Sequence, residues 1–246
     1  MNSYLDTTNF YIIAHRGGAA EAGATENSLA AFEYTAANSD KAYLACDVRM
    51  GEDGRLYLWH ESTAKIPNRP LKIGEKAPFF TPDELFARFP DNYFTVDPKD
   101  TLCLEPLADL IARHNVHNQI CIGTAFDARA RRVADLVEAN TGKRPFTALV
   151  SANASLELLT NPWALRKRKL SYQATFIHVH RSLISPLAIQ NAHKQGLRII
   201  AWVVNKPETM QKFIDWGIDG IMTDYPKRLQ NVLTNHQNDH KKSRNL

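Results

Sequence analysis

The chain has few cysteines, no long apolar run and no repeat of fixed period. Its three cysteines, Cys46, Cys103 and Cys121, lack the spacing of a disulfide framework or a zinc site, so we expect free thiols in a reducing compartment. No window is apolar for long enough to span a membrane, and we expect no integral membrane segment. The opening MNSYLDTTNF lacks the basic start and apolar core of a secretory signal, which favours a cytoplasmic location.

Two common catalytic signatures are also missing. The sequence has neither a glycine-rich nucleotide loop nor a Gly-x-Ser-x-Gly nucleophile elbow, which disfavours nucleotide-dependent and serine-hydrolase chemistry. The formal net charge is +4, but the basic residues are scattered, with clusters only at 166–169 and 241–244. No nucleic-acid-binding motif accompanies them, so we expect a small phosphate-bearing substrate and no nucleic acid. The sequence does not indicate an oligomeric state.

What is present has the size and pattern of one α/β barrel. The chain has 246 residues, 44% of them hydrophobic, and β-rich runs alternate with helical patterns, which predicts a (β/α)8 TIM barrel. We expect a single domain over residues 1–234 and a polar, disordered tail over 235–246. The predicted strands are Phe10–Ala14, Tyr43–Val48, Leu56–His60, Tyr93–Asp97, Gln119–Gly123, Thr147–Val150, Gln173–Val179, Arg198–Val203 and Gly220–Thr223.

These are nine strands for eight places in a barrel. The second and third are separated only by the turn Gly51–Gly54, which is too short for a crossover helix, so we expect a hairpin excursion between residues 43 and 61 at the barrel mouth. Two helix starts carry capping residues, with Asn27 before Ser28–Leu29 and Thr81–Pro82 before a helix over 83–89. The proline-rich stretch 66–80 predicts a loop beside the site.

Polar side chains follow four of the predicted strands at the point where each strand ends. They are His15 with Arg16, Asp47, His60 with Glu61, and Asp97 with Lys99. The carboxyl ends of parallel barrel strands meet at the mouth, so these groups are expected to converge there. Histidine can accept and donate protons near neutrality, and the arginine fork matches phosphate oxygens. The sequence therefore predicts a phosphate-binding, acid–base site.

In this order the motifs resemble the glycerophosphodiester phosphodiesterase family. The resemblance covers residues from about 10 to 233 and is weakest between 124 and 172. It extends to Gly196–Leu197, to Ala201–Asn205 and to Gly217–Pro226 in the C-terminal part. The motifs that carry its N-terminal part are His15–Gly17, Glu26–Phe32, Asp47–Val48, Asp53–Gly54 and His60–Glu61.

The resemblance implies metal-assisted hydrolysis of a phosphodiester, such as glycerophosphocholine or glycerophosphoethanolamine, to glycerol phosphate and an alcohol. By position, the general acid and base would be His15 and His60, and the phosphate oxygens would be held by Arg16 and Lys99. Glu26 and Trp202 would lie by the substrate, although a helix-capping role for Glu26 with Asn27 and a barrel-core role for Trp202 are equal alternatives. A divalent cation, Mg²⁺ or Ca²⁺, would be bound by Asp47 and Asp97.

The chain departs from the family pattern at the metal site. The family has a Glu-x-Asp pair on the second strand, and the corresponding residues here are Ala45, Cys46 and Asp47. The first carboxylate is missing, so we expect weaker cation binding, because affinity in oxygen sites depends on ligand charge and number. Glu61 stands where the family usually has aspartate.

Two other functions stay open at this point. One is a phospholipase D-like or lysophospholipid-cleaving enzyme on the same barrel, for which Pro78, Phe79 and Phe80 could form an apolar groove. The other is a catalytically silent barrel that binds a phosphate-containing ligand, because the first carboxylate is replaced by Ala45. The remaining histidines are expected to be structural, and of these His178 comes closest to a strand end.

Overall fold

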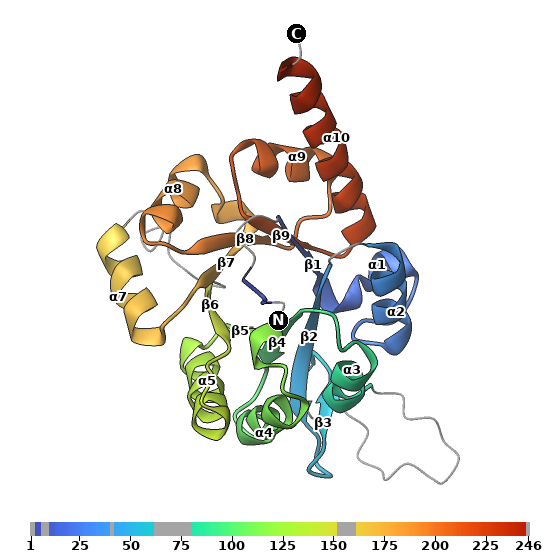
Figure 1. Cartoon of the computed structure of the whole chain (residues 1–246), viewed down its shortest axis with the longest axis vertical. Helices are drawn as coiled ribbons and strands as arrows, with labels where there is room; N and C mark the ends of the chain where they lie inside the picture. The colour runs from blue at the N-terminus through green and yellow to red at the C-terminus, as the bar shows by residue number, and fades with distance from the viewer. Residues whose placement is uncertain (1–2, 6–9, 40–41, 62–79, 152–160, 245–246) are drawn as a thin grey trace.

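The computed structural model describes residues 3–5, 10–39, 42–61, 80–151 and 161–244. Eight parallel strands follow one another in the order β1-β9-β8-β7-β6-β5-β4-β2, and β1 also pairs with β2, so the ring is closed (Figure 1). This confirms the predicted (β/α)8 TIM barrel. The strands are β1 (Tyr11–Ala14), β2 (Tyr43–Met50), β3 (Leu56–Leu58), β4 (Phe94–Pro98), β5 (Ile120–Thr124), β6 (Phe146–Ser151), β7 (Phe176–His180), β8 (Arg198–Trp202) and β9 (Gly220–Thr223).

The ninth strand forms the predicted hairpin. β3 pairs antiparallel with the end of β2, with Val48 opposite Leu58 and Met50 opposite Leu56. The turn is held by the backbone amide of Gly51, which donates to the carbonyl of Arg55 at 2.8 Å. β2 therefore runs past the barrel rim, and its partner strand leads directly into His60.

Helices cover the outside of the ring (Figure 1). Their inward faces carry apolar residues three or four positions apart, as the sequence pattern predicts. Examples are Leu107 and Ile111 in α4 and Val133 and Val137 in α5, all of which are fully buried. The helices are α1 (Ala19–Ala22), α2 (Leu29–Asn38), α3 (Pro82–Arg88), α4 (Leu104–His114), α5 (Asp127–Thr141), α7 (Pro162–Tyr172), α8 (Pro186–Lys194), α9 (Pro207–Asp215) and α10 (Pro226–Arg244).

The two predicted helix starts have different outcomes. α3 begins as expected, with a capping box in which the Thr81 side chain accepts from the Glu84 amide and the Glu84 carboxylate accepts from the Thr81 amide. At α2 the expected cap is wrong, because Ser28 is the N-cap residue and its hydroxyl accepts from the amide of Ala31. Asn27 is buried instead, with a positive φ of 57°, and its side chain points to the site.

An aromatic plug closes the end of the barrel opposite the site. Tyr4 is fully buried, and its hydroxyl is bonded to Thr95 Oγ1 at 2.7 Å. Its ring packs edge-on against Tyr43 and Phe176, with centroids 4.7 and 5.2 Å away. Tyr43 in turn donates from its hydroxyl to the Tyr4 carbonyl at 3.1 Å. This plug could not be predicted from the sequence, because Tyr4 and Leu5 form too short an apolar run to indicate a strand or a helix.

The C-terminal segment also differs from expectation. Residues 235–244 are not an unstructured tail but continue α10 to Arg244, as seen at the C-terminal end in Figure 1. Val232 and Leu233 anchor this helix on the core, and lysine, glutamine and arginine beyond them are good helix formers. No helix in the described ranges is long and apolar enough to cross a membrane. The expected loop over 66–80 lies almost wholly outside the described residues, and the single-domain assignment of 1–234 stays a prediction.

Candidate active site

A cavity of about 260 Å³ lies at the carboxyl ends of the barrel strands. Most of the predicted site residues line it together, although they come from five different strand ends. Glu26 is not among the lining residues and contacts Arg16 from outside. The predicted residues in the lining are His15, Arg16, Asp47, His60, Asp97, Lys99 and Trp202.

The turn after β1 presents His15 and Arg16 to this cavity. Arg16 has a φ of 49°, and Gly17 and Gly18 follow with φ of 85° and 71°. A Cβ on Gly17 would lie 3.0 Å from the Ala31 side chain, and one on Gly18 would lie 2.8 Å from Thr35 Oγ1. The glycines are therefore required here because they have positive φ and because the turn packs closely against α2.

His15 is oriented by residues from the last two barrel strands. Its Nδ1 lies 2.7 Å from Asp224 Oδ1, and the other Asp224 oxygen accepts from Asn205 Nδ2 at 2.7 Å. Asn205 Oδ1 accepts in turn from the amide of Asp224 and from the hydroxyl of Thr223. Burial alone would raise the pKa of Asp224, but the bonds from His15 and Asn205 hold it below the ordinary value. Asp224 is therefore a fixed anion behind the ring of His15.

His60 follows β3 directly and is held by its backbone. Its carbonyl accepts from Nε and Nη2 of Arg49, at 3.1 and 2.9 Å. Its Nδ1 lies 3.6 Å from Glu61 Oε1, so the carboxylate is near but not in hydrogen-bond contact. Burial lowers the pKa of His60, and the neighbouring cations Lys99 and Arg16 add to this effect. The ring is thus uncharged at neutral pH.

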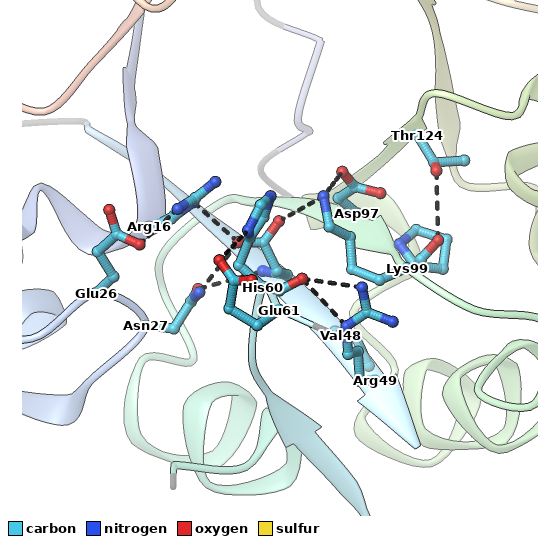
Figure 2. A network of polar contacts seen from close by, with 12 residues as sticks. Arg16, Glu26, Asn27, Val48, Arg49, His60, Glu61, Asp97, Lys99 and Thr124 are labelled. Carbon is cyan, nitrogen blue, oxygen red and sulfur yellow. Dashed lines mark hydrogen bonds and ion pairs between the residues drawn. The ribbon is translucent and has the colours of Figure 1, made fainter. Parts of the chain in front are cut away.

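Asp47 is enclosed by positive and polar groups. Its Oδ2 accepts from Asn27 Nδ2 at 3.0 Å and lies 3.2 Å from Arg16 Nε, and its amide donates to Asn27 Oδ1 at 3.2 Å. Its Oδ1 lies 3.2 Å from Lys99 Nζ. Burial alone would raise the pKa of Asp47, but Lys99 and Arg16 outweigh burial and hold it below the ordinary value. Arg16 is also bonded to Glu26, on the outer side of this group in Figure 2.

Lys99 joins Asp47 to the second carboxylate. Its Nζ donates to Asp97 Oδ2 at 2.8 Å, as expected for residues two apart on an extended strand (Figure 2). Burial disfavours the ammonium, yet Asp97 and Asp47 raise the pKa of Lys99 above its ordinary value. Burial raises the pKa of Asp97, and the like charge of Asp47 works in the same direction. Lys99 is the cation that both acids share.

The opposite wall of the cavity is formed by the neighbouring strands β5, β6, β7 and β8. His178 is 3% exposed, and burial lowers its pKa to about 4, so its ring is neutral. A Cβ on Gly123 would come within 3.2 Å of His178 Nδ1, so the absence of a side chain there makes room for the ring. Trp202 lines the same wall, and its ring stands edge-on to His180 at 5.4 Å. Trp202 is therefore a cavity-lining residue rather than sealed barrel core.

The residues present do not fit a cation held by three carboxylates. Within the described ranges no group of three or more histidine, cysteine, aspartate or glutamate side chains is arranged to bind a metal ion. Ala45 occupies the position of the missing acid, faces the cavity and is 5% exposed. The two acids that remain, Asp47 and Asp97, are both in contact with Lys99. We therefore derive no chemical step through a metal ion.

Three contributors to the site were not predicted. Asp224 and Asn205 orient His15, and Arg49 holds the backbone of His60. Asp224 and Asn205 do lie just after the strands β9 and β8, the same strand-end signal that indicated the predicted residues. Arg49 lies inside β2, beyond the barrel rim, and had no such signal.

Comparisons with known proteins agree with this geometry. A profile of the Glycerophosphoryl diester phosphodiesterase family matches residues 99–228. The chain is 26% identical to a probable glycerophosphodiester phosphodiesterase 2 of Mycobacterium tuberculosis over 84% of each chain, and 21% identical to the human lysophospholipase D GDPD1 over 91% of this chain and 86% of that one.

The fold is also shared with solved structures. An Oleispira antarctica phosphodiesterase, solved in complex with the product sn-glycerol-3-phosphate, superposes with a TM-score of 0.68 at 17% identity, and the match covers 91% of this chain and 96% of that one. The family profile spans more than half of this chain. The chain belongs to the glycerophosphoryl diester phosphodiesterase family, whose members hydrolyse glycerophosphodiesters to glycerol phosphate.

Proposed function

We propose that this enzyme hydrolyses a small glycerophosphodiester, of the glycerophosphocholine or glycerophosphoethanolamine kind, to glycerol phosphate and an alcohol. The observation that carries the proposal is that His15 and His60 line one cavity with Arg16 and Lys99. Two groups able to transfer protons and two permanent cations around a single space are what cleavage of an anionic diester requires.

His60 acts as the general base and His15 as the general acid. The attacking hydroxyl gives its proton to His60, whose ring is neutral because burial lowers its pKa. The new bond to phosphorus forms as the bond to the leaving oxygen breaks, and His15 supplies the proton that this oxygen takes up. Asp224 is bonded to His15 and stabilises the ring while it carries that proton. Water then attacks phosphorus and gives a proton to His15, while the bond from phosphorus to the first attacking oxygen breaks and that oxygen takes the proton back from His60. Both histidines return to their starting forms.

Arg16 and Lys99 hold the phosphate oxygens. Both cations lie at the cavity, and their side chains are 18% and 19% exposed, so solvent screens them less than it would screen surface charges. Arg16 is also fixed by Glu26, which therefore acts as a positioning residue rather than as a direct substrate ligand. Trp202 forms the wall against which the uncharged part of the substrate packs.

Enzymes of this family generally depend on a divalent cation. We propose that Mg²⁺ or Ca²⁺ binds this chain only weakly, because Asp47 and Asp97 are the only family-type carboxylate ligands among the described residues. When bound, such an ion would neutralise charge on the phosphate oxygens.

The size of the cavity favours a small substrate. Its volume of about 260 Å³ is below the range of roughly 300–1,000 Å³ that is usual for drug-sized ligands, which favours a glycerophosphodiester head over a ligand that is buried with its acyl chain. The similarity to a human lysophospholipase D supports the second candidate, in which the acyl chain lies outside the cavity. Of the residues expected to form a groove, Pro78 and Phe79 lie outside the described residues, and Phe80 packs against the core with its ring 6.0 Å from that of Phe32.

One experiment separates these functions. Purified enzyme is supplied with glycerophosphocholine, glycerophosphoethanolamine or lysophosphatidylcholine, and the glycerol phosphate, lysophosphatidic acid and free head group are quantified. The proposal expects glycerol phosphate from the first two substrates. Lysophosphatidic acid as the main product would favour the second candidate, and tight binding of these ligands without any product would favour the silent barrel.

The nucleophile in this reaction is proposed to be the glycerol hydroxyl next to the phosphate, which gives a cyclic phosphate before water enters. A substrate analogue that lacks this hydroxyl should then be inert. Turnover of the analogue at the normal rate would show that water attacks directly.

A further inference from the structure

In the part of the chain that the structure describes, no other acid takes the place of the missing carboxylate at position 45. Ala45 lies opposite Thr95 in the register of β2 and β4. Thr95 lines the same cavity, but its hydroxyl is already bonded to the Tyr4 hydroxyl at 2.7 Å. At the position of the first metal ligand, the chain therefore has only the methyl group of Ala45. The neighbouring Thr95 hydroxyl is already hydrogen-bonded to Tyr4.

The oxygens of the two remaining acids are also occupied. Asp47 uses Oδ1 for Lys99 and Oδ2 for Asn27 and Arg16, at distances between 3.0 and 3.2 Å. Asp97 uses Oδ2 for Lys99, and only its Oδ1 is buried without a hydrogen-bond partner. Mg²⁺ is usually held by one or two carboxylates together with waters and substrate phosphate, and Ca²⁺ takes six to eight oxygen ligands. Among the described residues of the site, these two acids offer one free oxygen, so either ion would have to compete with Lys99, Arg16 and Asn27 for the others.

Lys99 is held in this position by more than its side chain. Its amide donates to the Val48 carbonyl at 2.9 Å, and its carbonyl accepts from Arg129 Nη1 at 2.7 Å. The ammonium then reaches both carboxylates, 2.8 Å from Asp97 and 3.2 Å from Asp47. The positive charge between the two acids is therefore part of the folded chain.

The two buried acids are compensated without an added ion. Asp47 and Asp97 carry two negative charges, Lys99 lies between them, and Arg16 is shared between Asp47 and the half-exposed Glu26. A third acid at position 45 would add another negative charge and attract a divalent cation more strongly. In the present chain that attraction is weaker, and a divalent ion would have to displace the Lys99 ammonium or lie beside it.

We propose that Lys99, held between Asp47 and Asp97, supplies the positive charge that a divalent cation supplies elsewhere in the family, and that turnover needs no resident divalent cation. The proposal rests on the proposed function, because it concerns how that same site neutralises the phosphodiester. It predicts that substituting Ala45 changes the affinity for a divalent cation, and that substituting Lys99 changes the turnover in EDTA.

The first test measures binding and turnover separately. The full-length protein is stripped with EDTA and dialysed, and Mg²⁺ or Ca²⁺ is titrated by calorimetry. Glycerophosphocholine turnover is then followed in EDTA and in added cation. We expect no saturable binding below about 1 mM, where family-type oxygen sites would bind, and turnover that changes by less than about twofold. Stoichiometric binding at micromolar concentration, or a loss of more than about tenfold in EDTA, would overturn the proposal. If no condition gives turnover, the proposed function fails, and calorimetry still decides whether the site holds a metal.

The second test restores the missing acid. Ala45→Glu should gain cation affinity by at least about tenfold, since it adds a charged ligand on the strand that carries Asp47. Ala45→Gln is the matched control, because it adds nearly the same volume without charge and should gain nothing. Thermal melts check that both variants fold. A folded Ala45→Glu protein without increased affinity would contradict the assignment of position 45.

The third test removes the internal cation and does not depend on position 45. Lys99→Met should lower turnover in EDTA by about 10²-fold or more, as loss of a charge that stabilises the transition state does. Lys99→Arg should recover part of that loss, because it restores the charge with a different shape. Lys99→Met turnover within threefold of the natural protein in EDTA would overturn the proposal.

Discussion

His15 Nδ1 lies 2.7 Å from Asp224 Oδ1, although the two residues are 209 positions apart in the chain. The contact joins the end of the first barrel strand to the end of the last, and it exists only because the ring of strands closes. We therefore expect substitution of Asp224 to impair the function of His15 even though the β1 strand end itself is unchanged.

Asp224→Asn should lower kcat by roughly 10²-fold with little change in KM, because the amide keeps the shape but no longer stabilises a protonated His15 ring. A merely structural role would instead lower the melting temperature and raise KM. Asn205→Ala should have a smaller effect in the same direction, since it only orients Asp224. Unchanged kcat in Asp224→Asn would remove the pair from the mechanism.

The pH profile should report the environment of His60. Its pKa lies below the ordinary value of 6.5 because of burial and the nearby cations, so kcat/KM should rise with pH along a limb centred below pH 6.5. Glu61 opposes this shift, so Glu61→Gln should move the limb further down, by less than about one pH unit because the carboxylate is half exposed. A limb that moves upward would contradict the assigned role of His60.

His178 should make stability depend on acid. Its folded pKa is about 4 and its ordinary value is 6.5, so the unfolded chain binds the proton first as pH falls. The contribution of His178 to the free energy of unfolding is therefore fully present above pH 6.5 and is lost as the pH falls toward 4. Its total size is about 3 kcal/mol. Thermal melts across this range should show a shallower loss for His178→Gln than for the natural protein. His180→Gln is the control on the same strand, because that ring is partly exposed.

The turn that carries His15 can be tested with a pair of glycines. Gly18 and Gly142 have nearly the same φ, 71° and 70°, but a Cβ on Gly18 would approach Thr35 and Pro226 within 2.9 Å, whereas one on Gly142 meets open space. Gly142→Ala should cost about 1 kcal/mol of unfolding free energy, from φ alone. Gly18→Ala should cost at least about 2 kcal/mol and also lower activity. Equal losses would show that the packing at Gly18 is unimportant.

Much of the fold could be predicted because strand signals are local. All nine predicted strands agree with the observed ones to within three residues at each end, and the hairpin follows from a turn too short for a helix. The convergence of His15, Asp47, His60, Asp97 and Lys99 in one cavity follows from a single rule, that parallel strands bring their carboxyl ends together.

The rest depends on contacts that no local pattern encodes. Tyr4 fills the barrel from outside any regular element, and Asp224 meets His15 only through ring closure. Asparagine is a common N-cap residue, but Asn27 instead donates from its side chain to the carboxylate of Asp47. In each case a tertiary partner overrides or adds to the local preference.

The two-histidine hydrolysis is tested most directly by glycerol phosphate release from glycerophosphocholine at pH 7, measured for the natural protein, His15→Ala and His60→Ala. We expect clear turnover by the natural protein and a loss of about 10²–10⁴-fold in each variant, with melting curves that show both variants folded. Turnover within a few-fold of the natural protein in either folded variant would contradict the assignment of that histidine, and no turnover by the natural protein on any glycerophosphodiester would contradict the function itself.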